Sequence, residues 1–134
     1  MSVELLYLNA ERGDQQLVSV TDTYAGLRAG VGTYFEVVAL PFGDLWVPED
    51  NANVPVLTTG SGDEYQPVNE IATMLVVNFS PGTQMLAGCI LGNAVLSGVA
   101  DEEGNTTSVG REGREMVAKC VVHLARNKAR VADA

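Results

Sequence analysis

The sequence predicts a single α+β domain: a small, mostly antiparallel sheet with a short helix, a buried central helix and an amphipathic C-terminal helix. Three observations lead to this class. Residues 33–40, TYFEVVAL, are dense in aromatic and β-branched side chains, which favour strands. Residues 71–100 carry no charge in a chain that is 19% charged, so they are expected in the core. Residues 110–130 have apolar and polar faces at helical spacing. A length of 134 residues suits one domain, 1–134.

The first half of the chain predicts two hairpins with a helix between them. Residues 3–8, VELLYL, and the alternating residues 16–21 form the first pair, joined by a turn at Gly13. Thr21 or Asp22 caps a helix over 23–29, which Gly30 and Gly32 end. Residues 33–40 and 45–47 form the second pair, with a turn at 41–44.

A long polar connection follows at residues 48–66. Connections of more than about 12 residues often bind something, although a plain insertion is the alternative. If this one is a binding loop, its contacts would come from the polar and aromatic side chains Asp50, Asn51, Asp63, Glu64 and Tyr65.

The uncharged stretch divides at its turn residues. Pro67 in a first helical turn, or Asn69 as a cap, begins a helix over 70–78, but a strand remains open because short apolar runs fit either. Residues 80–83 break the run. Three glycines in 85–99 argue against a helix, so we expect two strands that bend at Gly92-Asn93, followed by a returning strand at 106–109.

The last segment predicts an amphipathic helix over 110–130, capped near Ser108. Glu115 and Lys119 make a favourable i,i+4 pair. The apolar face is formed by Gly113, Val117, Cys120, Val121 and Leu124. The polar face provides the candidate partner-binding residues Lys119, His123, Arg126 and Arg130.

Charge divides the chain. Residues 1–103 contain 14 acidic and 2 basic residues, a net charge of −12, whereas residues 104–134 contain 3 acidic and 6 basic residues, a net charge of +3. The overall charge of −9 disfavours nonspecific nucleic-acid binding. The apolar pieces on either side of 80–84 are too short to cross a membrane, and the N-terminal residues do not resemble a signal peptide. We expect a cytoplasmic protein.

Motifs for catalysis and cofactors are missing from the sequence. The one histidine, His123, has no metal-ligating neighbours at a suitable spacing and is expected to be a solvated surface residue. The Gly-x-Gly patterns do not extend to a nucleotide-binding fingerprint. Cys89 and Cys120 lie in apolar windows and are expected to be reduced and buried, with a disulfide as the alternative. No cofactor is expected, and an enzyme is not supported.

Several short motifs between Tyr24 and Gly98 resemble a known family. The matching segments are LRAGVGTYFEVVAL (27–40), DLWV (44–47), PVNEIAT (67–73), and the stretch from AGC (87–89) to AVLSG (94–98). They resemble a small-protein family of phages and Gram-positive bacteria catalogued as a domain of unknown function (number thirty-eight forty-six). The resemblance implies an α+β fold, a phage setting and no known reaction. Pro67, Asn69 and Thr73 would be family motif positions, with Asn69 structural as a helix cap.

Two functions of different classes follow. The first is a phage-type accessory protein that binds a macromolecular partner, expected to be a host protein, without catalysis; its acidic body could imitate nucleic acid toward a basic partner. The alternative is a virion or assembly component in which the acidic body and the basic helix meet between copies. A weaker alternative is a small-ligand or nucleotide binder that uses residues 48–66.

Overall fold

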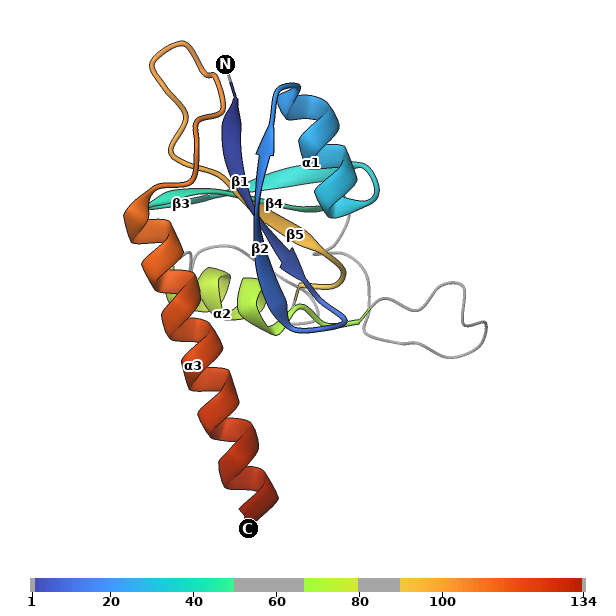
Figure 1. The fold of residues 1–134 in the computed structure, drawn as a ribbon, viewed down its shortest axis with the longest axis vertical. Coiled ribbons are helices and arrows are strands. Elements are labelled where there is room, and N and C mark those ends of the chain that lie inside the picture. The colour runs from blue at the N-terminus through green and yellow to red at the C-terminus, as the bar shows by residue number, and fades with distance from the viewer. Residues whose placement is uncertain (1, 50–66, 80–89, 134) are drawn as a thin grey trace.

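The computed structural model describes residues 2–49, 67–79 and 90–133. Within them, five strands form one antiparallel sheet in the order β2-β1-β5-β4-β3. The strands are β1 (Val3–Asn9), β2 (Asp14–Val20), β3 (Phe35–Leu40), β4 (Gly43–Pro48) and β5 (Ala94–Leu96). The helices are α1 (Thr23–Val31), α2 (Glu70–Phe79) and α3 (Arg111–Asp133). The predicted α+β class, with a short, a buried and an amphipathic helix, is therefore confirmed (Figure 1).

Both predicted hairpins are present, and a short central strand joins them. β1 pairs with β2 from Val3↔Val20 to Asn9↔Asp14, and β3 pairs with β4 from Phe35↔Pro48 to Leu40↔Gly43. β5 lies between the hairpins, with Leu96 opposite Leu6 of β1 and Leu45 of β4. The sheet is thus assembled from two local units held together by one strand from far along the chain.

The strands expected around β5 are shorter or missing. The predicted strand at 94–100 ends at Leu96, and the predicted strand at 106–109 is wrong. The physical reason is that the chain leaves the sheet after Ser97, and residues 106–109 do not rejoin it. The Gly98 N–H donates to Thr107 O at 3.0 Å, while the Val109 N–H donates to Glu4 O at 2.8 Å. These isolated bonds hold the loop without forming a ladder. The predicted strand at 85–91 lies mostly outside the described residues; Leu91 makes an isolated bridge to Val68.

Helix α1 begins at a side-chain cap, Asp22, and ends at a glycine, Gly32. The Asp22 carboxylate accepts from the Ala25 N–H at 3.1 Å, so Asp22 is the N-cap. Gly32, with φ of 86°, ends the helix, and its N–H donates to Arg28 O. Gly30 lies inside the helix rather than at its end. A Cβ on Gly30 would collide with Val95 Cγ2 and lie 2.7 Å from Tyr7 Cε1, so glycine lets α1 approach the sheet.

The uncharged segment after residue 69 is a helix, which settles the alternative left open by its sequence. α2 covers 70–79, and Asn69 caps it by accepting from the Ala72 N–H at 3.0 Å. Pro67 lies before the helix and not in its first turn. The Pro67 carbonyl accepts from the Gly92 N–H at 2.8 Å, so the proline is part of the bridge between this segment and residues 90–92.

Helix α3 has the predicted faces but different local contacts. Gly113, Val117 and Cys120 are buried, whereas the polar face is exposed. Ser108 does not cap the helix, because its hydroxyl accepts from the Glu4 N–H at 2.9 Å and so ties the loop to β1. The expected Glu115–Lys119 pair is replaced by Arg111–Glu115, with Nε and Oε1 2.9 Å apart.

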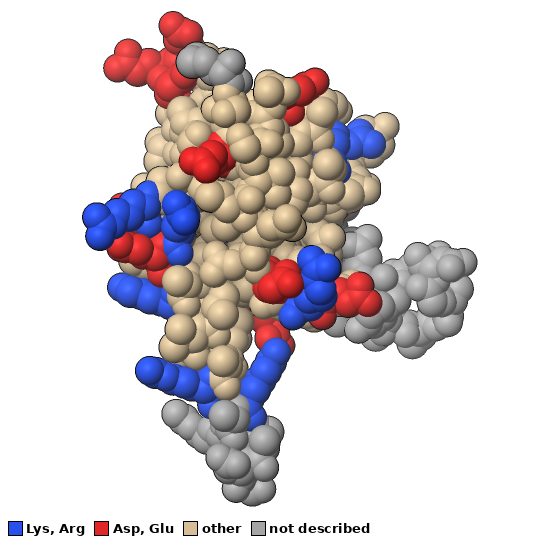
Figure 2. All heavy atoms as spheres, viewed as in Figure 1, with Lys and Arg blue, Asp and Glu red and all other residues tan. Residues whose placement is uncertain are grey.

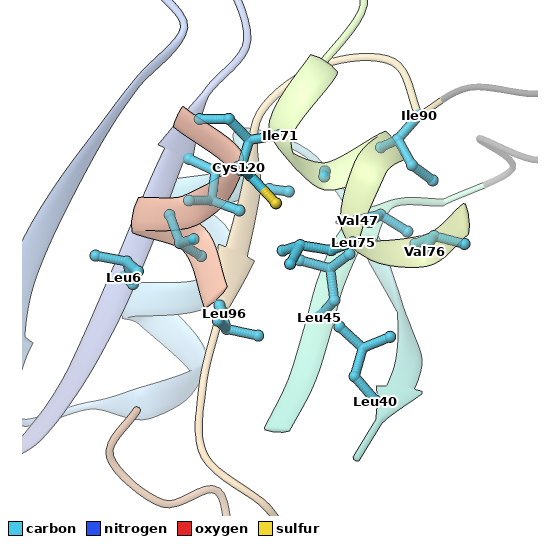
Figure 3. Close-up of a cluster of buried hydrophobic side chains, with 14 of the residues drawn as sticks. Leu6, Leu40, Leu45, Val47, Ile71, Leu75, Val76, Ile90, Leu96 and Cys120 are labelled. Atoms are coloured by element: carbon cyan, nitrogen blue, oxygen red, sulfur yellow. The ribbon is translucent and has the colours of Figure 1, made fainter. Parts of the chain in front are cut away.

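Alternation along the strands produces a core on each face of the sheet. Leu5 and Val95 point toward α1, while Leu6 and Leu96 point toward α2 and α3. Figure 3 shows the larger core, in which side chains from the sheet, α2 and α3 converge. Its labelled members are Leu6, Leu40, Leu45, Val47, Ile71, Leu75, Val76, Ile90, Leu96 and Cys120.

The last helix projects from this body. In Figure 1 the C-terminal part of α3 extends well below the sheet and α2. No helix among the described ranges has the length and apolar character that a membrane crossing requires. Arg126 and Lys128 of α3 are exposed to water, as charged side chains normally are.

The close approach at Gly30 gives a first test. We expect Gly30→Ala to lower the free energy of unfolding by about 1–3 kcal/mol, because the added methyl group overpacks the contact with Tyr7 and Val95. Urea unfolding would measure this. Gly110→Ala is the matched control, since a Cβ there meets nothing within 4 Å, and its effect should stay within about 0.5 kcal/mol. Equal effects of the two substitutions would contradict the packing argument.

Candidate functional site

The structure brings three of the four predicted residues of α3 to one surface. Lys119, His123 and Arg126 are exposed, and all three line a groove of about 540 Å³ between α2 and α3. Arg130 belongs to α3, but its side chain lies outside the described residues. The expectation that His123 is a solvated surface residue is confirmed. The Asn127 amide nitrogen lies 3.2 Å from the His123 Nε2 atom.

The floor of this groove is apolar and comes from both helices. Met74 and Phe79 belong to α2, and Met116 and Cys120 belong to α3. Phe79 is held in place by an edge-to-face contact with Phe42, whose ring centroid is 5.0 Å away. The two methionines have unbranched, flexible side chains, which lets them adjust to an apolar partner. The floor thus combines a fixed ring with an adaptable surface.

A second hollow, of about 590 Å³, continues the first along α2. The two share Met74, Asn78 and His123, so they form one trough, which we call the α2–α3 groove. Val77 of α2 and Val122 of α3 line the two parts, and each leaves about half of its surface in water. Exposed valines beside partly buried methionines make this a continuous apolar surface, a composition typical of interaction sites.

Two of the cations at the groove are free to meet a partner. Among the described residues, the ion pairs are Arg12–Asp14, Arg111–Glu115 and Lys128–Glu70. Lys119 and Arg126 take part in none of these. Figure 2 shows several Lys and Arg side chains along the α3 part of the visible face, with some acidic side chains among them, and further acidic side chains at the opposite end of the body. The first hollow is therefore basic on an acidic protein, while the second is also lined by Glu70, which pairs with Lys128.

The cysteine in the floor is not a reactive group. Burial raises the pKa of the Cys120 thiol, so it stays protonated at neutral pH and packs as a small apolar side chain. This agrees with the expectation of a reduced, buried thiol for Cys120. Cys89 lies outside the described residues. Within those residues, no group of three or more His, Cys, Asp or Glu side chains is placed to hold a metal ion.

The candidate binding loop cannot be added to this site. Its residues Asp50, Asn51, Asp63, Glu64 and Tyr65 all lie outside the described residues, so their predicted role stays a prediction.

Pro67, Asn69 and Thr73, the positions marked by the sequence resemblance, make structural contacts in this chain. The buried Asn69 amide donates through Nδ2 to Leu8 O and to Gly92 O, each at 3.0 Å. The Thr73 hydroxyl accepts from the Ile90 N–H at 2.8 Å. Together with the Pro67–Gly92 bond, these contacts fix the start of α2 against β1 and the segment before β5. The structural reading of Asn69 is thus confirmed, and Thr73 also lines the groove.

The apolar floor was missed by reasoning from sequence. Met74 and Met116 fall in two separate predicted helices, 70–78 and 110–130, and nothing in the sequence shows that these helices pack side by side. A signal did exist in α3, because Met116 lies at helical spacing from both Cys120 and Lys119. That pattern marks the boundary between the buried and basic faces, which is where the groove lies.

Removal of the Asn69 amide tests its structural role. We expect Asn69→Ala to lower the free energy of unfolding by about 2–4 kcal/mol, since it removes the α2 cap and leaves the Leu8 and Gly92 carbonyls without this buried donor. Chemical denaturation would measure the change. The comparison is Asp22→Ala, which removes an exposed cap from α1 and should cost only about 1 kcal/mol. A smaller loss at Asn69 than at Asp22 would refute the role.

Comparisons with protein-family models, with curated proteins and with solved structures find no match to this chain. The resemblance described from the sequence motifs therefore remains a prediction, and the site must be interpreted from its own geometry.

Proposed function

We propose that this chain is a non-catalytic accessory protein, of the kind that phages encode, which binds a partner protein of the host through the α2–α3 groove. One observation carries the binding site: Lys119, His123 and Arg126 lie around an apolar floor built from two helices. The phage setting and the host origin of the partner rest on the sequence resemblance alone.

The chemistry of the groove selects a partner segment with two properties. An apolar face would cover Met74, Phe79, Met116 and Val122, and each Å² of apolar surface removed from water contributes about 25 cal/mol. Carboxylates on that segment would meet Lys119 and Arg126. An amphipathic acidic helix has both properties and would lie against two helices as a third.

The same features favour protein over nucleic acid as the partner. Nucleic-acid sites present many cations, because affinity grows with the number of phosphates neutralised. The first hollow of the groove offers two permanent cations and a histidine around an apolar floor, on a chain with net charge −9. The proposal also includes a basic partner that would bind the acidic body of the chain.

Self-association through charge is the second candidate function. The basic α3 projects from one end of the molecule, and the acidic turn with Asp101, Glu102 and Glu103 is exposed. Contact between these two regions of successive copies would build an array, as in a virion or assembly component. A small ligand is a weaker candidate. The first hollow of the groove, with a volume of about 540 Å³, is within the size range of ligand sites.

Charge reversal at the groove tests the first candidate. The full chain would be immobilised and exposed to host lysate, and the captured proteins identified. We expect capture at physiological salt, and we expect the double substitution Lys119→Glu with Arg126→Glu to reduce it by about tenfold or more. A tenfold loss corresponds to about 1.4 kcal/mol of binding free energy, which replacing two attractions by two repulsions is enough to cause.

The control reverses the same number of charges on the same helix. Arg111→Glu with Arg114→Glu leaves the groove lining unchanged, because neither residue borders it, and capture should persist. If both double variants lose the partner equally, the groove is not the site. If the unsubstituted chain retains nothing at physiological salt, the binding function itself fails.

A further inference from the structure

The β3 edge of the sheet has a feature that the groove does not explain. Strand β3 is the last strand of the described sheet, and β4 is its one partner there. Its outward N–H and C=O groups make no ladder with another described strand. Such an edge is a template for pairing with another chain.

Neither edge strand of the described sheet carries the usual protection. Proteins normally protect edges with lysine, proline or bulges, and β2 and β3 both lack lysine and proline and pair with their neighbours residue for residue. β2 begins with the polar residues Asp14, Gln15 and Gln16, and a salt bridge between Arg12 and Asp14 lies beside it. β3 contains a single charge, Glu36, and is otherwise apolar, so it is the more apolar of the two described edges.

Apolar and aromatic side chains surround the β3 edge. Val37 points to the α1 face of the sheet, since it pairs with Trp46, and 48% of it is exposed. Tyr24 and Tyr34 are 62% and 64% exposed. The Arg28 guanidinium lies 4.5 Å from the centroid of the Tyr34 ring, and a hydrogen bond with Tyr24 raises the pKa of Arg28. Tyrosine and arginine are the residues that contribute most to interfaces.

Two partly buried rings, Phe35 and Trp46, support this surface. The Phe35 ring lies 5.7 Å from Tyr24 and 5.5 Å from Trp46, the latter edge to face. The Trp46 indole nitrogen donates to the buried Ser97 hydroxyl at 2.9 Å. An exposed tyrosine that packs against an anchored ring loses little freedom on binding, which favours association.

We propose that β3 pairs antiparallel with β3 of a second copy of this chain, so that two sheets join into one around a two-fold axis at Val37. In that register Val37 lies opposite its own copy, Phe35 lies opposite Ala39, and Glu36 lies opposite Val38. A large side chain meets a small one, and the two glutamates do not face each other. The strand is therefore complementary to itself, which favours a second copy over an unrelated extended segment.

Charge gives this dimer a recognisable salt dependence. Two copies each carry a net charge of −9, so their bodies repel at low ionic strength. Added salt screens that repulsion without weakening the apolar contacts or the strand ladder. The dimer should therefore strengthen as salt rises, whereas a complex in the basic groove with an acidic segment should weaken. The opposite responses separate the dimer from the proposed function.

Sedimentation of the full chain over a wide range of concentration tests the dimer. We expect a monomer–dimer equilibrium and a rise of about tenfold or more in its dissociation constant for Val37→Lys, because the two lysines would face each other across the axis. Leu17→Lys makes the same change on β2, where Leu17 is 37% exposed, and should leave the dimer intact. Circular dichroism would verify that both variants fold.

Cross-linking provides a second measurement, which detects the dimer directly and does not depend on a variant that loses it. Directly opposed residues of an antiparallel pair have Cα atoms about 4.5–5.5 Å apart, within the range that a disulfide spans. Val37→Cys should therefore give an oxidised dimer on a non-reducing gel, at a level that neither Leu17→Cys nor the unsubstituted chain reaches.

Three results would overturn the inference. One is a monomer at every concentration and salt, with no cross-link at Val37→Cys; in that case an extended segment of another protein becomes the better occupant of β3. Another is a dimer that Leu17→Lys dissociates, which would place the contact on β2. The third is a dimer that Lys119→Glu with Arg126→Glu dissociates, which would assign it to the basic helix.

Discussion

The buried amide of Asn69 is the interaction on which the arrangement of the α2 side depends. One side chain caps α2 and donates to carbonyls in β1 and in the turn before β5. These three segments are far apart in sequence, and an unpaired amide in the core would cost about 1–3 kcal/mol. Any other placement of α2, β1 or the turn before β5 would therefore lose at least one of these buried hydrogen bonds. Thr73 and Pro67 strengthen the same junction, so the start of α2 is fixed relative to the sheet.

The fixed start of α2 determines the geometry of the groove. Met74 lies about one helical turn after the cap, and Phe79 ends the helix against Phe42. α3 then packs on α2 through Val117 and Cys120, which places Met116 on the open side. The Lys128–Glu70 pair between the two helices is exposed and 3.5 Å long, so it contributes little. Apolar packing and one buried amide therefore stabilise the groove, and surface charge adds little to its stability.

The sequence was informative where a pattern is local and uninformative where contacts join distant segments. Both hairpins, α1 and the faces of α3 follow from turns, caps and periodicity, and the structure confirms them. The length of β5 and the loop after it depend on bonds from Gly98 and Glu4 to residues 107–108, which no local pattern encodes. For the site, the basic face of α3 was predictable because it lies on one helix. The methionine floor was not, because it exists only when α2 and α3 lie side by side.

The two exposed surfaces share a geometric cause. Five strands about 4.8 Å apart make a sheet roughly 19 Å wide, whereas a helix with its side chains is about 10 Å across. The single helix α1 can therefore shield about half of its face, and it sits over the centre, where Leu5 and Val95 are fully buried. The outer strand β3 on that face keeps Val37 in water. On the other face α2 and α3 cover the sheet, so the apolar residues of β1, β4 and β5 there are buried, and exposed apolar surface lies in the seam between α2 and α3. Each surface thus arises where helical cover ends: at the margin of a sheet on one side, and between two helices on the other.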